Sequence, residues 1–150
     1  MALINYITQI QFEFGAIGLL EQQCERLGIR RPLIVTDRGV KAAGIIDTVL
    51  DALAHASTVA LYDGTPPNPN EPAVREAVGA YMKGGCDGIV AVGGGSSIDL
   101  AKGVAVCATH DGPLQSFAVI EGGADRITSR TAPVIAGPLR CRCRRSSGRR

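Results

Sequence analysis

The sequence predicts an α/β fold with a doubly wound, mostly parallel sheet. Short, continuously apolar segments recur along the chain, and segments with the apolar periodicity of helices separate them. The apolar segments consist of Val, Ile, Leu and Ala, in a chain that has no Trp and only 4% aromatic residues. Such strands are typical of parallel sheets that are buried on both faces. A chain of 150 residues has the length of about one domain.

The first two predicted elements precede the buried strands. Residues 5–14 alternate apolar and polar side chains and are rich in aromatic and β-branched residues, which predicts a strand with one solvated face. Residues 16–27 carry apolar side chains at helical spacing, and Gly28 is a suitable residue to end a helix there.

The next segment predicts a strand, a helix and a second strand. Residues 32–36 and 57–62 are short apolar strands. The apolar side chains of residues 40–53 fall on one side of a single amphipathic helix. Residues 63–70 (DGTPPNPN) contain three prolines, one glycine and two asparagines, so they predict a loop.

The remaining elements repeat this alternation. Asn70 is placed to cap a helix that has Pro72 in its first turn and ends near Lys83. Residues 88–92 and 132–136 are two further apolar strands, and a helix is predicted between them over residues 96–108. We therefore expect one Rossmann-like domain over residues 1–138.

Charge divides the chain into a body and a tail. Residues 1–139 carry ten basic and fourteen acidic side chains, a net charge of −4 that gives no reason to expect nucleic acid as a partner. Residues 140–150 carry six arginines and no acid. No segment has the pattern of a signal peptide or a membrane span, and five widely spaced cysteines favour reduced thiols. These features predict a cytoplasmic protein.

The glycine turn in residues 90–102 (VAVGGGSSIDLAK) is the most informative motif. Three glycines after a buried strand let a ligand approach the backbone closely, and the amides at the start of the next helix attract an anion such as pyrophosphate. The motif matches neither the P-loop nor G-x-G-x-x-G. A plain turn is the alternative, because Ser96 and Asp99 have the spacing of a capping box.

Asp37 has two interpretations of similar weight. An acid at the end of a strand can accept hydrogen bonds from ribose hydroxyls and repel the 2′-phosphate of NADP. The same residue can instead be the N-cap of the following helix.

The motif VGGGSSIDLAK resembles GGGSxxDxAK of the iron-containing alcohol dehydrogenases. PLIVTDRGV, the NPN loop and TAPVIAGP accompany it in the expected order, so the resemblance covers residues 5–138. It implies an oxidoreductase that transfers hydride between an alcohol or aldehyde and NAD, with NADP less favoured. The overall likeness favours a small hydroxy acid such as 4-hydroxybutyrate as substrate.

The resemblance also implies where the cofactor lies. Gly94, Gly95 and Ser96 would hold its pyrophosphate, Asp37 would face the adenosine ribose, and Asn68 would lie on the adenosine side of the cleft. A homodimer is implied as well, since the first strand in such families often pairs with its counterpart in a second subunit.

Two residues of the following helix complete the implied site. Asp99 would lie near the nicotinamide, and Lys102 would support it. Their alternatives are a helix cap for Asp99 and a solvated charge for Lys102.

The resemblance ends in the tail. The family continues after Ala136 with a segment like PTTAGTGSEVGR, whereas this chain reads GPLRCRCRRSSGRR. A shifted reading frame that is later restored, or a sequencing error, is our hypothesis for residues 139–150, which we expect to be disordered. A metal site at Cys141 and Cys143, and RNA binding by the arginines, are the functional alternatives.

The metal half of the family is expected to be missing from this chain. The family's iron is held by one aspartate and three histidines of a helical C-terminal domain, and the only histidines here are His55 and His110. Both are expected to be surface residues. We thus expect no catalytic or metal-ligating residue in this chain and no turnover by the chain alone. The alternatives are a noncatalytic nucleotide-binding module, an RNA-binding protein, or a sibling glycerol dehydrogenase or dehydroquinate synthase.

Overall fold

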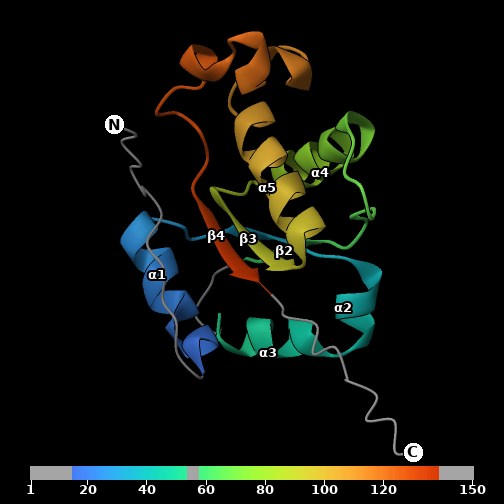
Figure 1. Cartoon of the computed structure of the whole chain (residues 1–150). Helices are drawn as coiled ribbons and strands as arrows, with labels where there is room; N and C mark the ends of the chain where they lie inside the picture. Colours follow the sequence, from blue (N-terminus) through green and yellow to red (C-terminus); the bar gives the residue numbers. More distant parts are fainter. Residues whose placement is uncertain (1–14, 54–57, 139–150) are drawn as a thin grey trace, which may run out of the picture.

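The computed structural model describes residues 15–53 and 58–138. These residues form one four-stranded sheet in which all three strand pairs are parallel, in the order β2-β1-β3-β4 (Figure 1). The strands are β1 (Pro32–Val35), β2 (Ala60–Tyr62), β3 (Gly88–Gly93) and β4 (Val134–Pro138). The doubly wound parallel sheet predicted from the sequence is confirmed.

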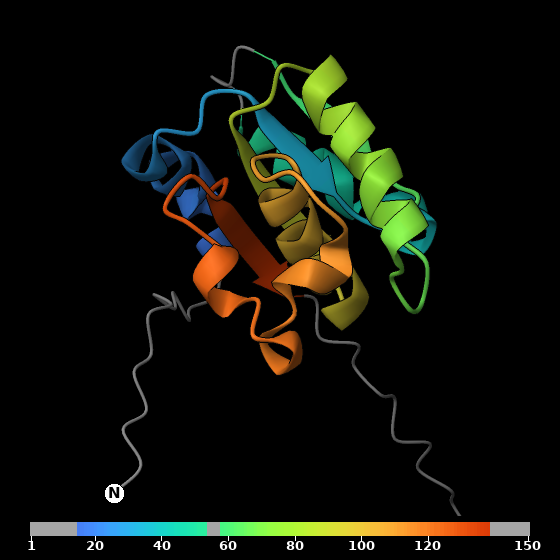
Figure 2. The same ribbon diagram turned by 90° about the horizontal axis from the view of Figure 1, so that it is seen from above.

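Helices cover both faces of the sheet (Figures 1 and 2). On one face lie α4 (Glu71–Lys83) and α5 (Gly95–Cys107), and on the other lie α1 (Leu20–Leu27) and α3 (Ile45–Asp51). Successive side chains of the central strands alternate between these layers, so Leu33 packs with α4 and α5 whereas Ile34 packs with α1 and α3. Every residue of β1 and β3 is buried.

The helix predicted over residues 40–53 is wrong as a single element. The structure has two helices there, α2 (Arg38–Ala42) and α3, separated at Gly44. Gly44 has φ +74°, the left-handed conformation that ends a helix and that glycine adopts without steric cost. The amphipathic pattern continues across the break because Val40 of α2 packs against the same apolar cluster as Ile46 and Val49 of α3.

The other boundaries differ less. The second strand spans only Ala60–Tyr62 of the predicted 57–62, and the first turn of the 16–27 segment is a 3₁₀ helix, η1 (Ala16–Leu19). Gly28 ends α1 with φ +72°, as predicted. The cap predicted at Asn70 is confirmed by a 3.1 Å hydrogen bond that its Oδ1 accepts from the amide of Ala73.

Some predictions fall outside the described residues. The strand at 5–14, His55 and the tail at 139–150 belong to this group. Among the residues that are described, no helix is long and apolar enough to cross a membrane.

The connection from α5 to β4 consists of three 3₁₀ turns. These are η2 (Leu114–Phe117), η3 (Val119–Glu121) and η4 (Ala124–Arg126). They lie beyond the C-terminal end of α5, at the opposite end of the sheet from the carboxyl ends of the strands (Figure 1). The sequence predicted no regular element in this stretch.

Gly88 at the start of β3 provides a test of this packing. A Cβ there would lie 2.6 Å from Ile29 Cδ1 and 2.8 Å from Cγ2, closer than such atoms approach. We expect Gly88→Ala to lower the free energy of unfolding by about 1–3 kcal/mol, because the core has no room for the methyl group. Urea denaturation would measure this.

The matched control is Gly79→Ala in α4. A Cβ at Gly79 has nothing within 4 Å, so this change should raise stability by about 0.5–1 kcal/mol through helix propensity. Equal effects of the two substitutions would contradict the packing described for β3.

Candidate functional site

A cleft of about 500 Å³ opens at the carboxyl ends of β1, β2 and β3. Three segments line it, each following one of these strands: Asp37, Arg38 and Gly39; Asp63, Gly64, Thr65, Pro66 and Pro67; Gly94 and Ser96. The chain passes from β1 outward to β2 and then returns to place β3 on the other side of β1. Ligands of open α/β sheets bind at such a topological switch point.

Asp37 caps a helix and also lines the cleft. It is the N-cap of α2, because its Oδ1 accepts a 2.9 Å hydrogen bond from the amide of Val40. It also lines the cleft. Its second oxygen, Oδ2, lies toward the glycine turn, since a Cβ added at Gly93 would be 3.6 Å from it. The cap is confirmed, and the contact with a ribose stays a prediction.

The three glycines of the turn differ in the physical reason why glycine is needed at each position. Gly93 has φ +150°, and a Cβ there would lie 2.6 Å from Ser97 Oγ, so both its conformation and its packing need glycine. A Cβ on Gly94 or Gly95 would meet nothing within 4 Å. These two positions therefore present bare backbone to open space, as close approach of a ligand demands.

Helix α5 offers free amides to that space. It begins at Gly95, with Gly94 as an N-cap that supplies no side-chain hydrogen bond. The capping box of Ser96 and Asp99 is therefore not formed, and that interpretation is wrong. The first amide that bonds within the helix is that of Ile98, which donates to the carbonyl of Gly94 at 3.3 Å. The amides that precede it in the first turn have no acceptor within the helix. With the positive end of the helix dipole they favour an anion.

The loop after β2 forms the opposite wall. The amide of Thr65 donates to the carbonyl of Thr36 at 3.3 Å, and the hydroxyl of Ser96 donates to the carbonyl of Pro67. Lys41 Nζ lies 2.5 Å from Asp63 Oδ2, and this hydrogen bond holds the pKa of Asp63 below its ordinary value. The wall is thus fixed to β1, α2 and α5.

Tyr62 supports the base of this wall. Its hydroxyl donates to Glu76 Oε2 at 3.1 Å, and a Cβ on Gly64 would lie 2.9 Å from its ring. Burial, followed by the hydrogen bond to Glu76, raises the pKa of Tyr62 to about 12. The phenol therefore stays protonated and joins α4 to the start of the loop.

The cleft brings together part of the predicted site. Asp37, Gly94 and Ser96 line it, and Gly95 lies between the last two. Asn68 is exposed one residue beyond the lining segment. Asp99 and Lys102 do not line the cleft. They are exposed on α5, where Lys102 Nζ donates to Asp99 Oδ1 at 3.1 Å.

Sequence reasoning missed the other lining residues, which are Arg38, Gly39 and the segment 63–67. Their signal was position, since both segments directly follow a predicted strand. Arg38 also adds a positive charge beside the acid of Asp37, which the motif-based prediction did not consider.

The groups around the cleft fit a dinucleotide. Besides the bare backbone at Gly94 and Gly95, the buried hydroxyl of Thr65, a residue that lines the cleft, has no hydrogen-bond partner within the described chain. Buried polar groups are normally paired. This hydroxyl and the bare backbone are the groups of the cleft that have hydrogen-bonding capacity for a ligand.

Comparison with known proteins identifies the family. The model of the iron-containing alcohol dehydrogenases matches residues 8–141. The chain belongs to this family. It is 57% identical over 138 residues to 4-hydroxybutyrate dehydrogenase of Cupriavidus necator, covering 92% of this chain and 36% of that protein. It is 38% identical over 139 residues to 1,3-propanediol dehydrogenase of Klebsiella pneumoniae, covering 89% and 35%.

Solved structures agree with this assignment. A 1,3-propanediol oxidoreductase superposes with a TM-score of 0.73 at 35% identity, over 83% of this chain and 32% of that one. The NADH-dependent butanol dehydrogenase A of Thermotoga maritima gives a TM-score of 0.79 at 29% identity, over 91% and 34%. The chain thus spans about a third of the length of these relatives, both the sequences and the solved structures.

The part of the chain that the structure describes contains no set of side chains that could bind the iron of the family. No three His, Cys, Asp or Glu side chains gather there in a way that could hold a metal ion. The described cysteines, Cys24, Cys86 and Cys107, are free thiols. The cleft at the carboxyl ends of the strands is therefore a candidate for the coenzyme and not for the metal.

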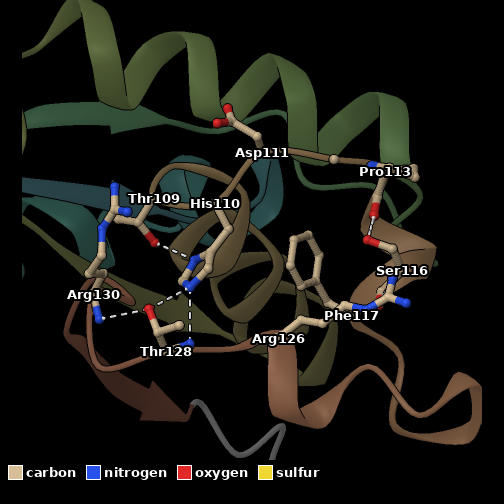
Figure 3. Close-up of a pocket in the computed structure, with 10 residues that line it drawn as sticks. Thr109, His110, Asp111, Pro113, Ser116, Phe117, Arg126, Thr128 and Arg130 are labelled. Carbon is tan, nitrogen blue, oxygen red and sulfur yellow. Dashed lines mark hydrogen bonds between the residues drawn. The ribbon is translucent and has the colours of Figure 1, made fainter.

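A second pocket, of about 420 Å³, lies between the end of α5 and the start of β4 (Figure 3). The ring of His110 lies between Thr109 and Thr128, with the edge of Phe117 beside it at a centroid distance of 5.7 Å. His110, which was expected at the surface, is half-buried and lines this pocket.

The partners of His110 assign its proton. The amide of Thr128 can only donate, so Nε2 accepts from it at 3.0 Å. The carbonyl of Val106 can only accept, so Nδ1 donates to it at 3.1 Å. Both ring nitrogens are therefore occupied in joining α5 to the segment before β4, and we assign His110 a structural role.

His110→Ala tests this role. The substitution removes the acceptor of the exposed Thr128 amide, so we expect a loss of about 0.5–1.5 kcal/mol in the free energy of unfolding by urea denaturation. Ile120→Ala is the control, since Ile120 is 94% exposed in the same connection and its truncation should change stability by less than about 0.5 kcal/mol. Similar values for both would argue against the network.

Proposed function

We propose that this chain is the coenzyme-binding part of an NAD(H)-dependent alcohol dehydrogenase of the iron-containing family. The observation that carries the proposal is the cleft at the switch point, where bare backbone of the glycine turn faces an acid at the end of β1. Family membership supports it, and so does the likeness to an NADH-dependent dehydrogenase of known structure.

The cleft suggests how the coenzyme is placed. The amides of the first turn of α5 would hold the pyrophosphate, and the adenosine would lie between Asp37 and the wall at residues 63–67. The nicotinamide would extend along α5 toward Asp99. When bound, the coenzyme accepts a hydride from the alcohol carbon as the hydroxyl loses its proton, which leaves an aldehyde.

The substrate we propose is a small hydroxy acid of the 4-hydroxybutyrate type. The support is the 57% identity to 4-hydroxybutyrate dehydrogenase of Cupriavidus necator. Since the described residues contain no metal-ligand set, we assign this chain no step that passes through iron. The homodimer and the cytoplasmic location predicted from the sequence stay predictions.

Gly94→Val tests coenzyme binding. Gly94 has an ordinary extended backbone and open space around it, so the side chain should not disturb the fold. It would occupy the space in which the pyrophosphate meets the amides. We expect NADH affinity, measured by fluorescence titration, to fall by at least about tenfold, which corresponds to 1.4 kcal/mol of lost contact.

Urea denaturation of the same variant is the control, and it should match the unchanged chain. Gly94→Ala should fall between the two in affinity because its side chain is smaller. Unchanged NADH affinity in Gly94→Val would refute the proposed site.

Asp37→Asn tests the choice between NADH and NADPH. Asparagine caps a helix as well as aspartate does, so the hydrogen bond to Val40 is retained while the charge is lost. We expect the ratio of NADH to NADPH affinity to fall by about tenfold, because removal of one nearby like charge eases entry of the 2′-phosphate. A ratio that does not change would place the ribose elsewhere.

A further inference from the structure

The hydroxyl of Ser96 already donates a hydrogen bond to another group of the protein. Ser96 is in the first turn of α5, and its Oγ donates to the carbonyl of Pro67, which lies 29 residues earlier on the opposite wall. A serine hydroxyl has one proton to donate. A phosphate oxygen of a dinucleotide needs a donor, so Ser96 cannot serve the phosphate with that proton while it holds Pro67.

The wall depends on this contact because of its composition. Pro66, Pro67 and Pro69 have no amide proton, so this stretch can be anchored mainly through its carbonyls. Within the described chain, the bond from Ser96 to Pro67 is the only hydrogen bond that residues 66–69 make. The neighbouring residues are secured separately, since Thr65 binds the carbonyl of Thr36 and Asn70 caps α4.

We infer that Ser96 is a positioning residue, whose hydroxyl holds the Pro66–Pro67 wall against α5 and so shapes the adenosine half of the cleft. The main-chain amides of the first turn of α5 are then the donors for the pyrophosphate. This inference deepens the proposed coenzyme function and differs from the sequence prediction, in which Ser96 itself holds the pyrophosphate.

The first experiment needs no ligand. Backbone ¹⁵N order parameters of the free chain, measured by NMR relaxation, should be lower at Gly64, Thr65 and Asn68 in Ser96→Ala than in the unchanged protein. Ser96→Thr keeps the hydroxyl and should restore the order parameters. Unaltered order parameters in Ser96→Ala would overturn the inference.

The second experiment uses two parts of the coenzyme as separate ligands. Titrations followed by NMR would compare adenosine, which has no phosphate, with inorganic pyrophosphate. Ser96→Ala should bind adenosine about two- to tenfold more weakly, the effect of one hydrogen bond, and should bind pyrophosphate as before. Weaker pyrophosphate binding with unchanged adenosine binding would make Ser96 a phosphate ligand and overturn the inference.

Ser116→Ala is a matched control. The hydroxyl of Ser116 also donates to a proline carbonyl, that of Pro113 at 2.7 Å, but at the other end of α5. It should alter neither the order parameters of residues 64–68 nor adenosine binding. If the unchanged chain binds neither adenosine nor NADH, the coenzyme function fails, while lower order parameters in Ser96→Ala would still establish the role of Ser96 in holding the wall.

Discussion

Burial of β1 and β3 on both faces is the constraint on which the rest of the structure depends. Their side chains alternate between two apolar clusters, so helices must cover the sheet on each side. Parallel pairing requires each connection to return to the same end of the sheet, and all strands therefore point their carboxyl ends the same way. Polar loops that have no place in the interior collect at that end.

The switch point converts this arrangement into a site. The connection that leaves β1 runs to α3 on one face of the sheet, whereas the connection that leaves β3 runs to α5 on the other face, so β1 and β3 leave a gap outside their ends. Asp37 and the glycine turn enter this gap from its two sides. Because Gly93 packs against Ser97, the backbone of the turn lies close to α5, and the space before Gly94 and Gly95 stays open.

Sequence patterns predicted the strands, the glycine turn and the cap at Asn70, because each depends on local chemistry. The break at Gly44 was missed because apolar periodicity reports burial and is indifferent to a single left-handed residue. The site was predicted in part for a related reason. A motif names residues that are close in sequence, such as Gly94 and Ser96, but the wall at residues 63–67 reaches them only through the order of the strands.

The hydrogen-bond partners of individual side chains were the feature that the sequence predicted least well. Ser96 has the residue type and position of an anion ligand, and His110 has the residue type of a metal ligand or proton carrier. In the structure the hydroxyl of Ser96 is directed to a carbonyl 29 residues away, and both nitrogens of His110 bind the main chain. Each contact joins one end of α5 to a loop. The polar side chains at the two ends of this helix thus bind backbone groups, which leaves the main chain of the glycine turn as the proposed anion-binding part of the cleft.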